Sequence, residues 1–211
     1  MQPLLREPMN CDIPCFWGII PGKTLFDDAR TFFSSLGFTP REGEDFYSIA
    51  YKSDNGVGFS VIFYTSGNII ENIKLTPVIV KPVEGSPREW IAYSPETLIK
   101  RFGSPSDVEF AIDNGPNYVV TMSMYFDTSG LIVLYSGYNM LPERPRSPFL
   151  CPLTAPFDYV RLWIGPNPTD PPSFETVSLV EATSLSMDQF IQLMLGDPQK
   201  ACFTINGDVF P

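Results

Sequence analysis

Hydrophobic and polar residues alternate along two stretches of the chain in the same order. When the two TSG tripeptides at 65–67 and 128–130 are aligned, the alternation in residues 57–64 matches that in residues 120–127. Alternation with a period of two is typical of strands with one buried face. The matched apolar positions are expected to face the core; they are Val57, Phe59, Val61 and Phe63 in the first stretch, and Val120, Met122, Met124 and Phe126 in the second.

The intervening positions form a mixed set that is expected to lie on the opposite face of the sheet. Its members are Gly58, Ser60, Ile62 and Tyr64, matched by Thr121, Ser123, Tyr125 and Asp127. Aromatic residues on an open sheet face are typical of protein-binding surfaces. We therefore take Ile62, Tyr64, Ser123 and Tyr125 as candidate binding residues. The alternative, which stays open, is that the proline-rich segment 142–172 covers this face.

Each alternating stretch follows a segment with helical periodicity. Residues 25–36 carry an apolar stripe, with Thr24 as the expected N-cap and Gly37 as the left-handed C-terminal residue. The second helix is expected to begin after Ser94 and to end at Gly103.

Asparagine–glycine pairs at 55–56 and 114–115 predict hairpin turns before the alternating stretches. The shared order of helix, strand, hairpin, strand, TSG turn and strand predicts a duplicated unit, at residues 18–75 and 94–138.

The third section, residues 145–211, breaks this pattern. "FDYVRLWIG" and "FETVSLVEA" predict strands around a proline-rich loop, and "LSMDQFIQLMLG" predicts a helix. In that helix Ser186 and Gln189 form a capping box. Together these elements predict one α+β domain over residues 1–211: two tandem units of a helix and an antiparallel meander, with the helices packed on one face of the sheet, and a C-terminal strand–helix segment.

The stretch "CFWGIIPGKT" superficially resembles a phosphate-binding loop. Such a loop needs four residues between its two glycines, whereas only three separate Gly18 from Gly22. One of these three is Pro21, which has no N–H to donate. The stretch therefore predicts the approach to the first helix, and we expect no nucleotide to bind.

Charge and composition exclude several functions. The 211 residues carry a net charge of −10 without a cluster of basic residues, so nucleic-acid binding is not expected. The chain has no histidine, which rules out Ser-His-Asp and Cys-His catalysis within it. No cofactor or metal motif is present, and the acidic group of Glu42, Glu44 and Asp45 predicts a solvated turn rather than a calcium loop. A histidine-free hydrolase with paired carboxylates remains the alternative to a binding protein.

The cysteines bear on the cellular compartment. The four cysteines permit three pairings, which the sequence does not decide; we favour Cys11–Cys15 and Cys151–Cys202. No apolar run is long enough to span a bilayer, and the start of the chain lacks the apolar core of a signal peptide. Either the protein is cytoplasmic or its signal has been removed, and the even cysteine count favours the second.

The helix that starts at "PGKT", with its following meander, resembles the small repeat of the SmpA/OmlA-type outer-membrane assembly lipoproteins and the tandem repeat of the β-lactamase inhibitory proteins. The resemblance covers 18–75 and 94–138, although those repeats often have two helices where one is expected here. "CDIPCFWGIIPGKT" is also similar to the opening of bacterial secreted or lipoprotein-like proteins of unknown activity. This last similarity implies an extracytoplasmic place but no known activity, and none of the resemblances identifies functional residues. Together with the open aromatic sheet face, it leads us to expect an extracytoplasmic, non-enzymatic interaction module, secreted or lipid-anchored.

Overall fold

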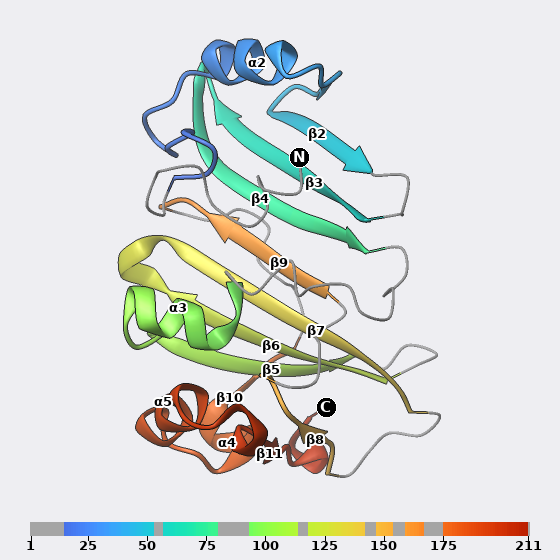
Figure 1. Cartoon of the computed structure of the whole chain (residues 1–211), viewed down its shortest axis with the longest axis vertical. Coiled ribbons are helices and arrows are strands. Elements are labelled where there is room, and N and C mark those ends of the chain that lie inside the picture. Colours follow the sequence, from blue (N-terminus) through green and yellow to red (C-terminus); the bar gives the residue numbers. More distant parts are fainter. Residues whose placement is uncertain are drawn as a thin grey trace. The chain divides into compact units, whose positions relative to one another are not determined.

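A computed structural model describes residues 15–52, 57–79, 93–113, 118–141, 147–153, 159–166 and 175–210. These residues form an α+β fold with a nine-stranded antiparallel sheet and four α-helices (Figure 1). The chain divides into two compact units. The first comprises Met1–Glu89, Asp127–Ile132 and Arg161–Pro171, and the second comprises Trp90–Phe126, Val133–Val160 and Pro172–Pro211.

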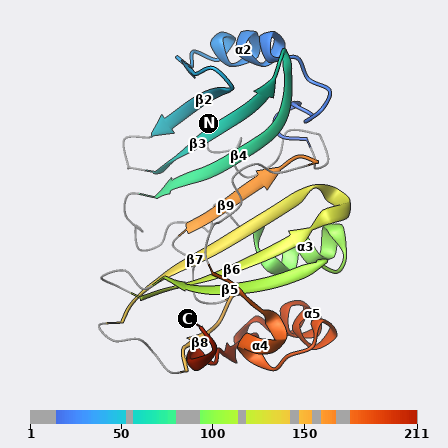
Figure 2. The same cartoon turned by 180° about the vertical axis from the view of Figure 1, so that it is seen from behind.

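The first unit contains five strands in the order β1-β2-β3-β4-β9, of which β2, β3 and β4 can be followed side by side in Figure 2. They are β1 (Arg41–Glu42), β2 (Phe46–Lys52), β3 (Val57–Ser66), β4 (Ile69–Ile79) and β9 (Tyr159–Ile164), of which Arg161 onward belongs to this unit. The antiparallel register places Val61 between Ile49 and Leu75. One face of this sheet is consequently buried and apolar, and it is formed by Tyr47, Ile49, Phe59, Val61, Phe63, Ile73, Leu75, Leu162 and Ile164.

Helix α2 (Phe26–Ser35) packs on this apolar face. The ring of its buried Phe33 lies 5.3 Å from that of Phe63, measured between centroids. Gly37 follows the helix at φ +83°, as expected, and the Phe38 N–H bonds to the Phe33 carbonyl, which completes a Schellman motif. The expected N-cap was wrong, because the helix is preceded by Leu25 without a side-chain cap.

The hydroxyl of Thr24 instead stabilises the loop before the helix. Its Oγ1 accepts a 2.8 Å hydrogen bond from the Ile20 N–H. The N–H groups of Lys23 and Thr24 both bond to the Ile20 carbonyl, and the Gly22 N–H bonds to the Ile70 carbonyl of β4. The backbone donors of "GKT" are therefore all used within the protein.

The residues before this loop form a tight hairpin that inserts an aromatic side chain into the core. Phe16 and Ile19 exchange both backbone hydrogen bonds, and the two turn residues, Trp17 and Gly18, have φ of 52° and 79°. Such positive angles at both positions are typical of a type I′ turn. Trp17 is buried, and its ring lies 5.1 Å from that of Phe59.

The second unit contains strands in the order β7-β6-β5-β10. They are β5 (Asp107–Asp113), β6 (Tyr118–Phe126), β7 (Leu131–Leu141, of which Val133 onward lies in this unit) and β10 (Val177–Ser178). The short turn η2 (Asp127–Ser129) lies in the first unit. The core-facing positions predicted for β6 are buried, together with their β5 neighbours; the set is Val108, Phe110, Ile112, Val120, Met122, Met124 and Phe126.

Helix α3 (Pro95–Phe102) begins and ends as the sequence predicts. Ser94 accepts a hydrogen bond from the Thr97 N–H, Pro95 occupies the first turn, and Gly103 has φ +82°. The Phe102 ring lies 5.8 Å from that of Phe126. The two asparagine–glycine hairpins expected at 55–56 and 114–115 lie outside the described residues.

The C-terminal segment differs in part from its prediction. The strand expected at "FETVSLVEA" is limited to β10, and the chain then turns into helix α4 (Leu179–Thr183). The switch is explained by a capping box between Ser178 and Glu181, which satisfies the first free N–H groups of a helix. Helix α5 (Met187–Leu195) has the predicted Ser186–Gln189 capping box.

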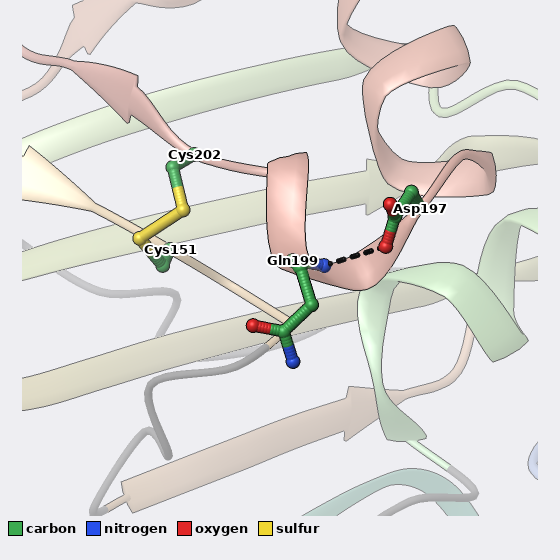
Figure 3. The surroundings of a disulfide bond; sticks show 4 residues. All are labelled: Cys151, Asp197, Gln199 and Cys202. Carbon is green, nitrogen blue, oxygen red and sulfur yellow. Dashed lines mark hydrogen bonds between the residues drawn. A yellow bond between two sulfur atoms is a disulfide. The ribbon is translucent and has the colours of Figure 1, made fainter.

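The end of the chain is tied to the second unit by a disulfide. After α5 come η3 (Pro198–Lys200), β11 (Phe203–Thr204) and η4 (Gly207–Val209), and β11 pairs with β8 (Phe149–Leu150). The predicted Cys151–Cys202 bond is present beside this pair (Figure 3). Cys15 is also disulfide-bonded, while Cys11, its predicted partner, lies outside the described residues. Among the described helices, none is long and apolar enough to cross a membrane.

Candidate functional site

The first unit's sheet has a second face, turned away from α2, and the predicted residues Ile62 and Tyr64 both lie on it. The register places Tyr64 between Phe46 of β2 and Asn72 of β4, and Ile62 between Ser48 and Lys74. Lys74 in turn is paired with Trp163 of β9. We call this surface the Ile62 face and define it as Phe46, Ser48, Ile62, Tyr64, Asn72, Lys74, Arg161 and Trp163.

Exposure changes across the Ile62 face. At the β2–β3 side Phe46 is 41% exposed, and Ile62 and Tyr64 are half-buried. At the β4–β9 side Asn72 is 4% exposed and Trp163 is 1% exposed. The face thus has an open end that a macromolecule can contact and a closed end at which Asn72 and Trp163 are out of its reach, while Lys74 and Arg161 are half-buried.

Phe46 is held in place by the chain that precedes it. The Gly43 N–H bonds to the Phe46 carbonyl, and the Phe46 ring lies so close to Gly43 that a Cβ there would be 2.2 Å from the ring. The Phe46 ring therefore packs against the backbone of Gly43, where a side chain would not fit.

Two cations flank the indole of Trp163 at the closed end. Lys74 Nζ and Arg161 Cζ each lie 5.5 Å from the centroid of the ring, within the range of a cation–π interaction. The indole Nε1 of Trp163 and the side-chain Oδ1 of Asn72 are buried and have no hydrogen-bond partner among the described residues. Buried polar atoms are normally paired, so these two require an explanation.

A glycine brings Asn72 close to β9. A Cβ on Gly165 would lie 2.2 Å from Asn72 Oδ1 and 2.7 Å from the Glu71 carbonyl oxygen. Gly165 also has φ +149°, which side-chain-bearing residues rarely adopt, and its N–H bonds to the Gly130 carbonyl at 2.8 Å. Gly165 therefore permits the amide of Asn72 to lie beside the strand that carries Trp163.

The other two predicted residues, Ser123 and Tyr125, lie in the second unit, on the face opposite its apolar side. Their cross-strand partners on β5 are Glu109 and Asp107, respectively. The Tyr125 hydroxyl donates a 2.7 Å hydrogen bond to Glu109 Oε2. Burial, followed by this hydrogen bond and the charges of Glu109 and Asp107, raises the pKa of Tyr125 well above its usual value. Ser123 is only 3% exposed, so a partner can reach Tyr125 but not Ser123 in this structure.

The acidic residues considered from the sequence are placed on the surface. Glu42, Glu44 and Asp45 are exposed, and Glu42 lies 3.7 Å from the Arg30 guanidinium. In the part of the chain that the structure describes, no three acidic or cysteine side chains are grouped to hold a metal ion. The hydrolase alternative requires two neighbouring carboxylates. Asp107 and Glu109 share a sheet face, but the Glu109 carboxylate accepts a hydrogen bond from the Tyr125 phenol.

Asn72, Lys74, Arg161 and Trp163 were not among the residues predicted from the sequence. The alternation in "NIKL" and "RLW" does place each pair of residues on one face of its own strand. The two pairs of residues come together only because β4 pairs with β9. These strands are far apart in the sequence, and no local pattern specifies that they pair.

Comparison with models of known protein families, with curated proteins and with solved structures finds no match for this chain. The resemblance to SmpA/OmlA-type lipoproteins and β-lactamase inhibitory proteins therefore stays a prediction.

Proposed function

We propose that this chain is a non-enzymatic protein-interaction module that binds a partner protein at the open end of the Ile62 face. The observation that carries the proposal is the cross-strand pair of Phe46 and Tyr64, with Ile62 beside it on the same face. Phe46 is exposed although it is large and apolar. Rigid aromatic side chains contribute large contact areas at a small entropic cost, and they are enriched where partners bind.

Charge on the same face indicates what kind of partner fits. Lys74 and Arg161 lie on the Ile62 face, beside Trp163 at its closed end. The chain as a whole is strongly acidic. A partner with an apolar patch bordered by acidic side chains would complement both parts.

We further propose that residues 18–75 and 94–138 arose by duplication. The order α2, β2, β3, β4 in the first segment matches α3, β5, β6, β7 in the second. The buried positions Phe59, Val61 and Phe63 match Met122, Met124 and Phe126, in support of a common origin. Each of the two segments has one helix, whereas the lipoprotein repeats that the sequence resembles often have two.

We place the module outside the cytoplasm, secreted or lipid-anchored. The disulfide between Cys151 and Cys202 supports this location, because such bonds persist mainly in oxidising compartments.

The partner can be sought by site-specific photo-crosslinking. A photoreactive phenylalanine analogue in place of Tyr64 should trap the partner in cells that make the protein, and the same analogue at exposed Thr31 on α2 serves as the control. The trapped protein is then purified and its affinity measured by calorimetry.

A matched pair of variants tests the face itself. Phe46→Ser should weaken binding at least tenfold, as expected for a central aromatic contact. Leu36→Ser removes a side chain of similar exposure, 44% against 41%, from the C-terminal end of α2 and should leave the affinity unchanged. Equal effects of the two substitutions, or no effect of Phe46→Ser, would refute the proposed site.

A further inference from the structure

A β-bulge in β4 turns an isoleucine out of the core of the first unit. The register between β3 and β4 shifts at Glu71, which is the extra residue of the bulge. The shift moves Ile70 to the core side, where it is fully buried, and turns Ile69 to the side of the Ile62 face, where it is 40% exposed. Strict alternation would have placed these two side chains the other way round. The bulge therefore creates an exposed apolar position that a regular strand would have buried.

Leu25 lies directly opposite Ile69 and enlarges this position to a pair. Two backbone hydrogen bonds of 3.0 Å between residues 24–26 and residues 68–70 flank an antiparallel bridge between Leu25 and Ile69. In a non-hydrogen-bonded pair of this kind the two side chains share one face and lie close together. Leu25, which is 43% exposed, therefore lies on the same side of the sheet as Ile69.

This pair continues the open end of the Ile62 face. Among the described residues of the first unit, four large apolar side chains are exposed, and they are Leu25, Leu36, Phe46 and Ile69. All but Leu36, which directly follows α2, lie on the side of the Ile62 face. Tyr64 lies between Phe46 and the pair, because β3 separates β2 from β4. We call Phe46, Tyr64, Ile69 and Leu25 the apolar strip.

The residues that border the apolar strip are mostly acidic. Five exposed carboxylates stand within three residues of a strip residue along the chain, namely Asp27, Asp28, Glu44, Asp45 and Glu71. Two exposed cations lie at the same border: Lys23 stands two residues before Leu25, and Arg41 is paired with Ser48 on β2. Negative charge therefore predominates around the strip, which favours a partner with positive charge around its own apolar contacts.

We propose that the apolar strip docks a protein segment that carries leucine-like side chains flanked by lysine or arginine. The proposal rests on the proposed docking function of the Ile62 face and names the chemistry of the partner at its open end. The closed end has the opposite charge, because Lys74 and Arg161 lie there beside Trp163. A partner that complements both ends has its basic residues at the strip and its acidic residues at the other end, so it is bound in one orientation.

A short amphipathic peptide of leucine and lysine serves as the probe. Its affinity for the full-length protein is measured by calorimetry at physiological ionic strength. Two counterparts are measured in parallel, one with glutamate in place of lysine and one with serine in place of leucine. The leucine–lysine peptide should bind about tenfold more tightly than either counterpart, because it alone matches both the apolar strip and its acidic border.

Variants at the bulge then locate the binding site. Ile69→Ser should weaken binding of the leucine–lysine peptide about fivefold, whereas Ile69→Val, which keeps an apolar side chain, and Leu36→Ser should not. Glu71→Lys should also weaken it. Glu175→Lys makes the same change in net charge at an exposed residue of the second unit and should have a clearly smaller effect.

A methyl signal in the wild-type protein gives a readout that does not depend on how Ile69→Ser folds. In protein labelled at its isoleucine δ1 methyl groups, the Ile69 signal is assigned by its loss in Ile69→Val. It should shift and saturate with the leucine–lysine peptide, whereas the signal of buried Ile49 on the other side of the sheet should not move. An Ile69 signal that stays in place while the peptide binds would overturn the proposal.

The remaining outcomes separate this proposal from the proposed function. Wild-type affinity in Ile69→Ser with weaker binding in Phe46→Ser would refute the extended strip and leave the site at Phe46 intact, whereas wild-type affinity in both would refute both. Equal losses in Glu71→Lys and Glu175→Lys would mean that net charge alone attracts the peptide. Sedimentation with phosphatidylcholine vesicles that is lost in Ile69→Ser, without peptide binding, would mean that the strip contacts a membrane instead.

Discussion

The phenol of Tyr125 on β6 donates a 2.7 Å hydrogen bond to Glu109 Oε2 on the neighbouring strand β5. Both side chains are half-buried, so each depends on the other for part of its polar contacts. We expect Tyr125→Phe to lower the free energy of unfolding by about 1–2 kcal/mol, because it leaves the Glu109 carboxylate without this donor. Urea denaturation measures the change. Tyr64→Phe, at a half-buried phenol in the first unit, is the control, and an effect of the same size there would contradict this explanation.

Alkaline pH should destabilise the second unit through its buried tyrosines. Burial raises the pKa of Tyr93 to about 12, and it also raises the pKa of Tyr135, whose hydroxyl donates to the Tyr93 carbonyl. Above pH 10, the usual tyrosine pKa, these phenols ionise in the unfolded chain but remain protonated in the folded one. The unfolded state then binds fewer protons, so the contribution of these two tyrosines to the free energy of unfolding should be constant below about pH 9 and fall from pH 10 to 12.

Denaturation at a series of pH values, together with absorbance at 295 nm, tests this behaviour. Tyr135→Phe should flatten the alkaline decline even though it lowers stability at neutral pH. A wild-type stability that rises between pH 10 and 12 would contradict the assigned direction of these pKa shifts.

Reduction of the Cys151–Cys202 disulfide should strongly destabilise the protein. The bond joins cysteines separated by 51 residues. For a loop of this length the chain-entropy model gives a stabilisation of about 4 kcal/mol. The double variant Cys151→Ser/Cys202→Ser should therefore melt at a clearly lower temperature, as should wild type in reductant. Four free thiols in protein taken from its native compartment, with no melting shift on reduction, would refute both this prediction and the extracytoplasmic location.

Gly165→Ala should be among the most destabilising small substitutions in the first unit. The new Cβ would meet Asn72 Oδ1 and the Glu71 carbonyl oxygen at 2.2 and 2.7 Å, and the backbone would be held at φ +149°. We expect a loss of roughly 3 kcal/mol or more, since unfavourable backbone angles alone cost about 1–3 kcal/mol. Gly67→Ala is the matched control, because Gly67 also has positive φ but nothing lies within 4 Å of its Cβ position. Chemical denaturation of the two variants should show a clear difference.

The protein should not bind ATP or GTP at micromolar concentrations. The N–H groups of Gly22, Lys23 and Thr24 already donate to the carbonyls of Ile70 and Ile20, so they are not directed toward a phosphate. Isothermal titration calorimetry checks this, and a micromolar dissociation constant would contradict the structural interpretation of "PGKT".

Local signals predicted local structure well. The Ser186–Gln189 and Ser94–Pro95 patterns specify helix starts through contacts within four residues, and both helices begin there. The Ser178–Glu181 capping box is equally local, but the alternating apolar residues around it favoured a strand. Thr24 fits a helix N-cap in the sequence, yet the Ile20 N–H competes for its hydroxyl, and only the folded loop shows which donor prevails.

Long-range pairing was beyond what the sequence could predict. Ile62 and Tyr64 share a face because they are two residues apart on one strand, and that much follows from alternation. Trp163 meets Lys74 only because β9 pairs with β4 across a separation of almost half the chain. Neither the position of Lys74 beside the indole nor the burial of Ser123 has a signature in the neighbouring residues.

The two compact units alternate along the chain, and this affects how the protein can fold during synthesis. The first unit takes its residues from Met1–Glu89, from Asp127–Ile132 and from Arg161–Pro171, with the second unit's residues between them. A ribosome adds roughly 5–20 residues per second, so the stretch from Glu89 to Pro171 takes several seconds to emerge. During that interval the nascent chain has β4 without β9, and the edge that will receive Trp163 is left for a chaperone, or for another nascent chain, to cover.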